Sequence, residues 1–226
     1  MSESAPAVLF DVDGTLVDTN YLHAVTWWEA FAQAGFQVPM TAIHRAIGMG
    51  SDQLLEELLP PDRDREKDAR TSDAHSAIYS TYWSRLKALD GAADLLRACK
   101  EHGLRVVLAS SADESQFQVL RAALAAEDAI DAATSSADVA DAKPAPDLVQ
   151  VALDKACTDP DHAVFVGDTI WDVRACQRAG VRCVGLLSGG ISADELSRAG
   201  AVAIYDSPAD LLGSFSSSPL GELVSG

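Results

Sequence analysis

The residues with the clearest chemical potential form a short run near the start of the chain, Asp11-Val12-Asp13-Gly14-Thr15. An apolar segment, residues 7–10, precedes the run, and a glycine and a hydroxyl follow the two acids, which is typical of a buried strand that ends in a tight turn. Two carboxylates this close repel each other, and one holds its proton unless a cation lies between them. The run therefore fits a cation-binding acid pair or, equally well, a polar loop with two solvated acids.

Other polar residues stand just after apolar segments further along the chain: Ser110, Lys143-Pro144, Gly167-Asp168 and Asp172. In open α/β sheets, ligands bind beyond the carboxyl ends of the strands, which lie along one edge. Because Asp11, Ser110, Lys143 and Asp168 all fall just past predicted strands, we expect folding to bring them to the same edge. This convergence follows from the predicted topology alone.

In their order along the chain, these motifs resemble those of the haloacid dehalogenase superfamily of aspartate-nucleophile phosphatases and phosphomutases. The matching elements are Asp11-x-Asp13-Gly14-Thr15, Ser110, Lys143-Pro144 and Gly167-Asp168-Thr169-x-x-Asp172, which together span residues 7 to about 187. Each motif alone is weak, whereas four of them in the family's order are specific.

The resemblance implies that Mg²⁺ is the cofactor, held by Asp11, by the backbone carbonyl of Asp13 and by Asp168. Oxygen ligands without a nearby histidine or thiol favour Mg²⁺ over zinc or copper. Asp172 would lie outside these direct ligands or bind through water. Alternatively, Asp172 is an ordinary acid in the first turn of a helix, where the helix dipole stabilises it.

By the same resemblance, Asp11 is the nucleophile that attacks phosphorus, and Asp13 protonates the leaving oxygen and then deprotonates water. A dehalogenase lacks an aspartate at this second position, so Asp13 points to phosphoryl transfer. Lys143 and Ser110 would bind the phosphoryl oxygens, where charge must be stabilised. Outside this context, Lys143 would be a surface-loop lysine and Ser110 a helix cap.

The chain divides into two kinds of sequence pattern. Residues 20–85 contain helical patterns and no convincing strand, whereas helices alternate with short apolar runs after Asp90-Gly91. This alternation predicts an α/β fold, a Rossmann-like parallel sheet with helices on both faces. We predict a catalytic core of residues 1–18 and 86–226 and an inserted four-helix cap of residues 19–85. In the family such a cap closes over the site, excludes water and selects the substrate.

Several finer expectations concern the cap and the end of the chain. A helix over about 21–34 should bury the face that carries Ala24, Val25, Trp28, Phe31 and Ala32. The tryptophans Trp27, Trp28 and Trp83 are interpreted as cap core, and His23 as a structural histidine, although it could face the cleft. From Gly213 onward, a serine-rich run predicts a loose tail.

Composition narrows the class of protein. The 226 residues carry a net charge of −17, which argues against nucleic acid and anionic membranes as partners. The four cysteines, Cys99, Cys157, Cys176 and Cys183, have no zinc-type spacing, so we expect reduced thiols in a cytoplasmic protein. Neither a signal peptide nor a membrane-spanning stretch is expected.

The main hypothesis is a Mg²⁺-dependent phosphatase of a small phosphorylated metabolite, such as phosphoglycolate or a sugar phosphate. It would act through an aspartyl-phosphate, as a monomer or weak homodimer. One alternative is a β-phosphoglucomutase-type phosphomutase, which needs a second phosphate site on the cap. The stretch after Gly48 supplies no cation and has an acid at Asp52, so Arg45 on the preceding helix would have to substitute. The other alternative is a catalytically silent binding protein on the same fold.

Overall fold

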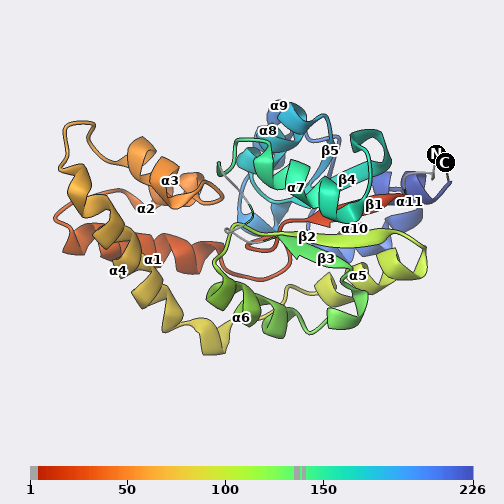
Figure 1. Ribbon diagram of the computed structural model, residues 1–226, viewed down its shortest axis with the longest axis horizontal. Helices are drawn as coiled ribbons and strands as arrows, with labels where there is room; N and C mark the ends of the chain where they lie inside the picture. The colour runs from red at the N-terminus through yellow and green to blue at the C-terminus, as the bar shows by residue number, and fades with distance from the viewer. Residues whose placement is uncertain (1–4, 135–137, 139–140, 226) are drawn as a thin grey trace.

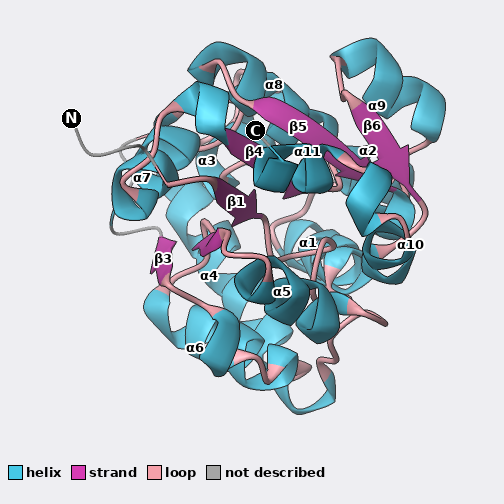
Figure 2. Cartoon of the chain, turned by 90° about the vertical axis from the view of Figure 1, so that its right-hand side faces the viewer, coloured by secondary structure: helices cyan, strands magenta, loops and turns pink. Residues whose placement is uncertain are grey.

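The computed structural model describes residues 5–134, 138 and 141–225. Its centre is a six-stranded sheet in the order β3-β2-β1-β4-β5-β6, in which each neighbouring pair is parallel. The strands are β1 (Ala7–Phe10), β2 (Arg105–Ala109), β3 (Ala132–Thr134), β4 (Ala163–Gly167), β5 (Arg182–Leu186) and β6 (Ala203–Tyr205). The predicted α/β fold with a Rossmann-like parallel sheet is confirmed (Figures 1 and 2).

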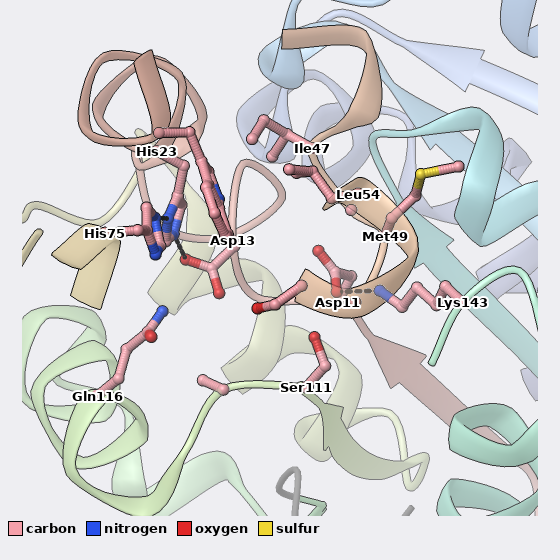
Figure 3. Close-up of a pocket in the computed structure, with 15 residues that line it drawn as sticks. Asp11, Asp13, His23, Ile47, Met49, Leu54, His75, Ser111, Gln116 and Lys143 are labelled. Carbon is pink, nitrogen blue, oxygen red and sulfur yellow. Dashed lines mark hydrogen bonds and ion pairs between the residues drawn. The ribbon is translucent and has the colours of Figure 1, made fainter. Parts of the chain in front are cut away.

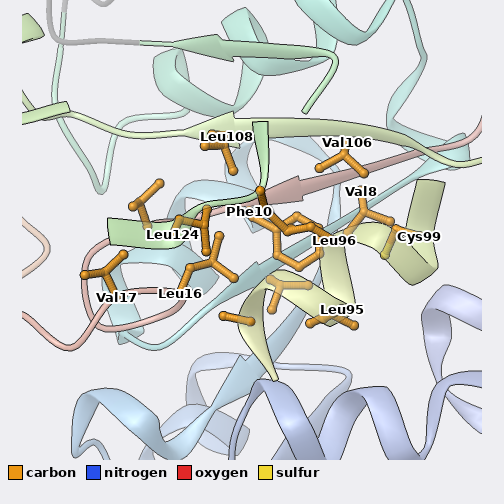
Figure 4. Packing of buried hydrophobic residues seen from close by; sticks show 14 of the residues in the cluster. Val8, Phe10, Leu16, Val17, Leu95, Leu96, Cys99, Val106, Leu108 and Leu124 are labelled. Atoms are coloured by element: carbon orange, nitrogen blue, oxygen red, sulfur yellow. The ribbon is translucent and has the colours of Figure 1, made fainter. Parts of the chain in front are cut away.

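Side chains of the central strand alternate between two apolar layers, as a period of two requires. Val8 and Phe10 join the layer beneath α5 (Ala92–Glu101), α6 (Glu114–Leu124), α10 (Pro208–Gly213) and α11 (Pro219–Ser225), part of which Figure 4 shows. Ala7 and Leu9 join the opposite layer, beneath α7 (Asp147–Ala156), α8 (Ile170–Ala179) and α9 (Ala193–Ala199). Both faces of the strand are fully buried, which explains its continuous apolar sequence.

Four helices between β1 and β2 lie beside the carboxyl-end edge of the sheet, where the cap is predicted, and we propose that they form it (Figure 1). They are α1 (Asn20–Gln33), α2 (Met40–Ala46), α3 (Ser51–Leu58) and α4 (Asp68–Ser80), and they bury an apolar cluster of their own. The two connections to the core run side by side, since Asp18 N–H donates to the Lys87 carbonyl at 3.0 Å and Val17 bridges Ala88. We propose this paired segment as the hinge between core and cap, at the predicted boundaries.

Short 3-10 helices complete the description: η1 (Arg65–Lys67), η2 (Trp83–Arg85), η3 (Glu127–Ala129), η5 (Pro160–His162), η6 (Leu187–Gly189) and η7 (Phe215–Ser217). Among the described residues, none of the helices combines the length and the apolar character needed to cross a bilayer.

The predicted buried face of α1 is wrong by about one position. Trp27 is buried, whereas Trp28 is 44% exposed and Val25 is 37% exposed. The buried face also carries Asn20, His23 and Thr26, so polar side chains interrupt its apolar periodicity. Two of them, Asn20 and His23, contact acids of the site. Trp83 likewise differs from the expectation, because it packs against the core cluster under the sheet and not against the cap cluster.

The prediction of a loose tail after Gly213 is also wrong. Phe215 and Leu220 are buried in the core layer, and the ring of Phe215 lies 4.6 Å from that of His102. Ser218 is buried as well, and its hydroxyl accepts a hydrogen bond from the Leu220 N–H at 3.2 Å. The serines thus serve as local hydrogen-bonding groups at the start of α11, a role that composition alone does not reveal.

Candidate active site

Three buried carboxylates and one buried lysine meet at the carboxyl edge of the sheet. Asp11 directly follows β1, Asp168 directly follows β4, and Asp172 lies in the first turn of α8. One carboxylate oxygen from each of the three lies within 4.8 Å of the others. Lys143, from the loop before α7, places its Nζ 2.5 Å from Asp11 Oδ1 and 2.6 Å from Asp172 Oδ1 (Figure 3). The folded chain therefore brings these four predicted residues together.

Asp168 is fixed by residues from two other segments. The Thr15 hydroxyl donates to its Oδ1 at 2.7 Å, and Nδ2 of Asn20 donates to its Oδ2 at 2.7 Å. A side chain at Gly189 would place its Cβ 1.7 Å from the same Oδ2, so the acid can lie there only beside a glycine. Sequence reasoning missed Asn20 as a site residue, because a lone asparagine at the start of a helix looks like a cap.

Burial dominates the electrostatics of the cluster. It raises the pKa of Asp11 to about 7, with Lys143 opposing the shift and Asp172 adding to it. Burial, then repulsion from Asp11 and Asp172, also raises the pKa of Asp168. For Lys143, burial would lower the pKa, but attraction to Asp11 and Asp172 outweighs it and the pKa is raised. One buried lysine, in contact with Asp11 and Asp172, thus balances only part of the charge of three buried acids.

The donor set suits Mg²⁺. Within the described part of the chain, the cluster consists of carboxylate oxygens and contains neither a thiol nor an imidazole. A divalent ion together with Lys143 would bring three positive charges to three carboxylates. The three carboxylates thus match Mg²⁺ in their oxygen ligands and, with Lys143 present, in their total charge.

Asp172 makes two sets of contacts inside the protein. Its Oδ2 accepts hydrogen bonds from the Thr169 N–H at 3.0 Å and the Thr169 hydroxyl at 2.6 Å, which completes a capping box at the start of α8. Its other oxygen pairs with Lys143. The two interpretations from the sequence, a helix-terminal acid and a residue of the site, therefore apply together.

Asp13 lies apart from the carboxylate cluster and faces the cap. His23 Nε2 is 3.3 Å from Asp13 Oδ1, and His23 Nδ1 is 3.2 Å from Nε2 of His75 on α4. Burial would raise the pKa of Asp13, but the hydrogen bond and charge of His23 outweigh it, so the pKa is lowered. Gly14 turns the chain between the two acids with φ +76°, and a Cβ there would lie 2.4 Å from the Asn20 amide.

Ser110 is buried just after β2, and its Oγ accepts a hydrogen bond from the Ala112 N–H at 3.1 Å. The residues that face the cavity from this loop and the following helix are Ser111, Ala112 and Gln116. The phosphoryl-binding role of Ser110 stays a prediction. Neither Ser111 nor Gln116 was singled out from the sequence, since a serine and a glutamine near a helix start carry no distinctive pattern.

A cavity of about 130 Å³ opens above Asp11 between core and cap. Its core wall consists of Asp11, Asp13, Ser111, Ala112, Gln116 and Lys143. Its cap wall consists of His23, Trp27, residues 47–51, Leu54 and His75 (Figure 3). Trp27 serves both the cap core and this wall, and its ring stacks on His75 at 4.2 Å.

The His75 ring predicts a pH-dependent stability. Burial, followed by the neighbouring His23, lowers the pKa of His75 from 6.5 to about 2. In the unfolded chain this ring binds a proton below its ordinary pKa, whereas in the folded chain it stays neutral, so acid favours unfolding. As the pH is lowered from about 6 to about 4, this group alone should lower the free energy of unfolding by about 1.4 kcal/mol per pH unit.

Urea unfolding at several pH values measures this effect. The matched variant is His75→Phe, which retains a ring against Trp27 and cannot titrate. Its unfolding free energy should depend less steeply on pH than that of the wild type. Equal slopes for the two proteins would contradict the buried neutral histidine.

The chain is similar to known proteins over most of its length. Residues 5–180 match the family model of haloacid dehalogenase-like hydrolases. A solved structure of a hydrolase from Pseudomonas syringae superimposes with a TM-score of 0.89 at 34% identity and covers 94% of this chain and 98% of its own. Among curated proteins, the protein CbbY of Cereibacter sphaeroides is 29% identical, covering 92% of this chain and 94% of that protein. The phosphoglycolate phosphatase of Rhodospirillum rubrum is 27% identical, with 91% and 88% covered.

These similarities extend over nearly the whole chain and include both the sheet and the inserted helices. The predicted resemblance and the prediction of a phosphatase of this superfamily are confirmed. The chain belongs to the haloacid dehalogenase-like hydrolase family.

Proposed function

We propose that this protein is a Mg²⁺-dependent phosphatase that hydrolyses a small phosphorylated metabolite through an aspartyl-phosphate. The observation that carries the proposal is the group of three buried carboxylates, within 4.8 Å of one another, with a single buried lysine against them. Such a group suits an ion held next to a nucleophile. The phosphoglycolate phosphatase of Rhodospirillum rubrum supports a small phosphate ester as the substrate class.

Each residue has a role that its position supports. Asp11 lies at the bottom of the cavity and attacks phosphorus, while Lys143 holds its carboxylate in place and neutralises phosphoryl oxygens. Asp13 faces the cap side, where the leaving oxygen departs, and exchanges protons with it and with water.

The ion would be held by Asp11, Asp168 and the backbone carbonyl of Asp13. When bound, Mg²⁺ would stabilise the charge on the phosphoryl oxygens and favour the ionised form of Asp11. Asp172 already directs both oxygens to Thr169 and Lys143, which supports placing it outside the direct ligands.

The phosphomutase alternative requires a second phosphate site, and the residue considered for it is Arg45. Its guanidinium pairs with Glu195 at 2.5 Å on the outer surface, and Arg45 does not line the cavity. Among the described residues of the cap wall, no other lysine or arginine could take its place. This arrangement favours hydrolysis over isomerisation.

The proposal is tested by phosphate release from a panel of small phosphate monoesters, with Mg²⁺ or with excess chelator. We expect phosphate release that depends on Mg²⁺, and from β-glucose 1-phosphate no isomerisation to glucose 6-phosphate. Efficient isomerisation with little free phosphate would instead establish the mutase. Full activity in excess chelator would show that the carboxylate cluster does not hold an ion that the reaction needs.

A variant makes the metal test specific to this site. Asp168→Asn should raise the Mg²⁺ concentration needed for half-maximal activity by about tenfold or more, because a neutral amide is a weaker ligand for a hard cation. Asp161→Asn removes the same charge from an exposed position and should leave the Mg²⁺ titration unchanged. Equal titrations for wild type and Asp168→Asn would exclude Asp168 as a ligand.

A further inference from the structure

The two walls of the cavity differ sharply in charge. Of the fifteen described residues that line it, the lysine and both acids belong to the core wall. The cap wall presents apolar side chains, above all Ile47, Met49 and Leu54, which lie together over Asp11 (Figure 3). Since the phosphoryl group must lie against Asp11 and Lys143, the alcohol part of the substrate points toward the cap wall.

The two histidines of the cap wall offer little to an anion. Both ring nitrogens of His23 are engaged, one with Asp13 at 3.3 Å and the other with His75 at 3.2 Å. His75 is stacked on Trp27, and burial lowers its pKa to about 2, so that it carries no charge. Neither ring is therefore free to pair with a carboxylate or a second phosphate of a ligand.

Charges near the cap end of the cavity work against an anionic leaving group. Asp13 also lines the cavity, and its carboxylate lies 3.3 Å from His23 Nε2, so this residue offers no positive charge to an anionic group. The cation closest in sequence to the cap wall, Arg45, is bound to Glu195 outside the cavity. Neutral hydrogen-bonding side chains are nevertheless present, namely Ser111 and Gln116 on the core wall and Ser51 on the cap wall.

We infer that the cap wall selects phosphate monoesters of small, uncharged, hydroxylated alcohols and disfavours those whose leaving group carries a carboxylate or a second phosphate. This inference rests on the proposed phosphatase function and names its substrate class. The apolar side chains cover the carbon skeleton of the alcohol, and Ser111 and Gln116 accept or donate hydrogen bonds to its hydroxyls. Met49 lies on the cap wall on the Lys143 side of Asp11 (Figure 3), and an added positive charge at this residue should weaken the selection.

A matched pair of substrates tests the inference directly. 2-Hydroxyethyl phosphate and phosphoglycolate have nearly the same size. The first carries a hydroxymethyl group where the second carries a carboxylate. We expect kcat/KM to be about thirtyfold higher for 2-hydroxyethyl phosphate, which corresponds to about 2 kcal/mol. Equal values, or a preference for phosphoglycolate, would overturn the inference and leave the phosphatase function intact. No phosphate release from either ester, or from any other small monoester, would overturn both.

A charge-introducing variant provides the second arm. Met49→Lys keeps a long unbranched side chain and should shift the ratio of kcat/KM values about fivefold or more toward phosphoglycolate. Met49→Leu controls for the change of shape and should keep the wild-type ratio. Met40→Lys adds the same charge at a cap methionine that is 42% exposed and lies outside the cavity, so its ratio should also stay unchanged. A shift as large in Met40→Lys would show that the general charge of the cap, and not its wall, sets the ratio.

Discussion

Asp11→Asn is expected to abolish turnover of phosphate esters, with a loss in kcat of about 10⁴-fold or more, as for other removed nucleophiles. An amide oxygen cannot attack phosphorus to form the covalent intermediate that this site requires. The fold should be retained, because asparagine has the shape of aspartate and the site is buried. Lys143 keeps its second partner, Asp172, at 2.6 Å.

Phosphate release and thermal unfolding, measured on the same preparation, check this expectation. Asp161→Asn, at an exposed position, controls for the loss of one negative charge and should retain full activity. If Asp11→Asn kept more than a few per cent of the wild-type activity, with contaminating phosphatase excluded, Asp11 would not be the nucleophile. Asp13 would then be the next residue to examine, since it is the other acid that lines the cavity.

Most of the fold was accessible from the sequence because its signals are local. The strands before Asp11 and Asp168 are short apolar runs that end in polar residues, and parallel topology then places these acids at one edge. The long helical stretch predicted between the first two strands likewise corresponds to the helices α1 to α4. In these segments the local pattern and the tertiary structure agree.

The parts that could not be predicted depend on contacts between distant segments. Asn20 holds Asp168 from the helix α1, Gly189 at the end of η6 leaves room for its carboxylate, and neither residue has a local signal. The buried face of α1 was misassigned because His23 and Thr26 interrupt its apolar periodicity. Likewise, a serine-rich end was interpreted as loose, although Leu220 within it is fully buried.

Removing Lys143 is the change with the next largest expected effect. Lys143→Ala should lower kcat by about 10²–10³-fold, the magnitude found when one preorganised electrostatic group is lost. The structure gives the reason, since this ammonium contacts Asp11 at 2.5 Å and Asp172 at 2.6 Å and is the sole lysine or arginine among the described residues that line the cavity. Its loss also leaves two buried acids without the positive charge that they pair with, which costs about 3–5 kcal/mol of stability when both remain charged.

Three further variants separate catalysis from folding. Lys143→Met fills the volume of the lysine stem, so its activity loss reports on the charge alone. Lys143→Arg should restore activity poorly, because a planar fork cannot replace a compact ammonium between two carboxylates. Lys100→Ala removes an exposed lysine that pairs with Asp131 and should leave kcat unchanged. Near-wild-type kcat in a folded Lys143→Met would mean that the lysine only balances the charge of Asp11 and Asp172. The phosphoryl group would then have to be bound by other groups, with the backbone N–H groups after β2 as the first candidates.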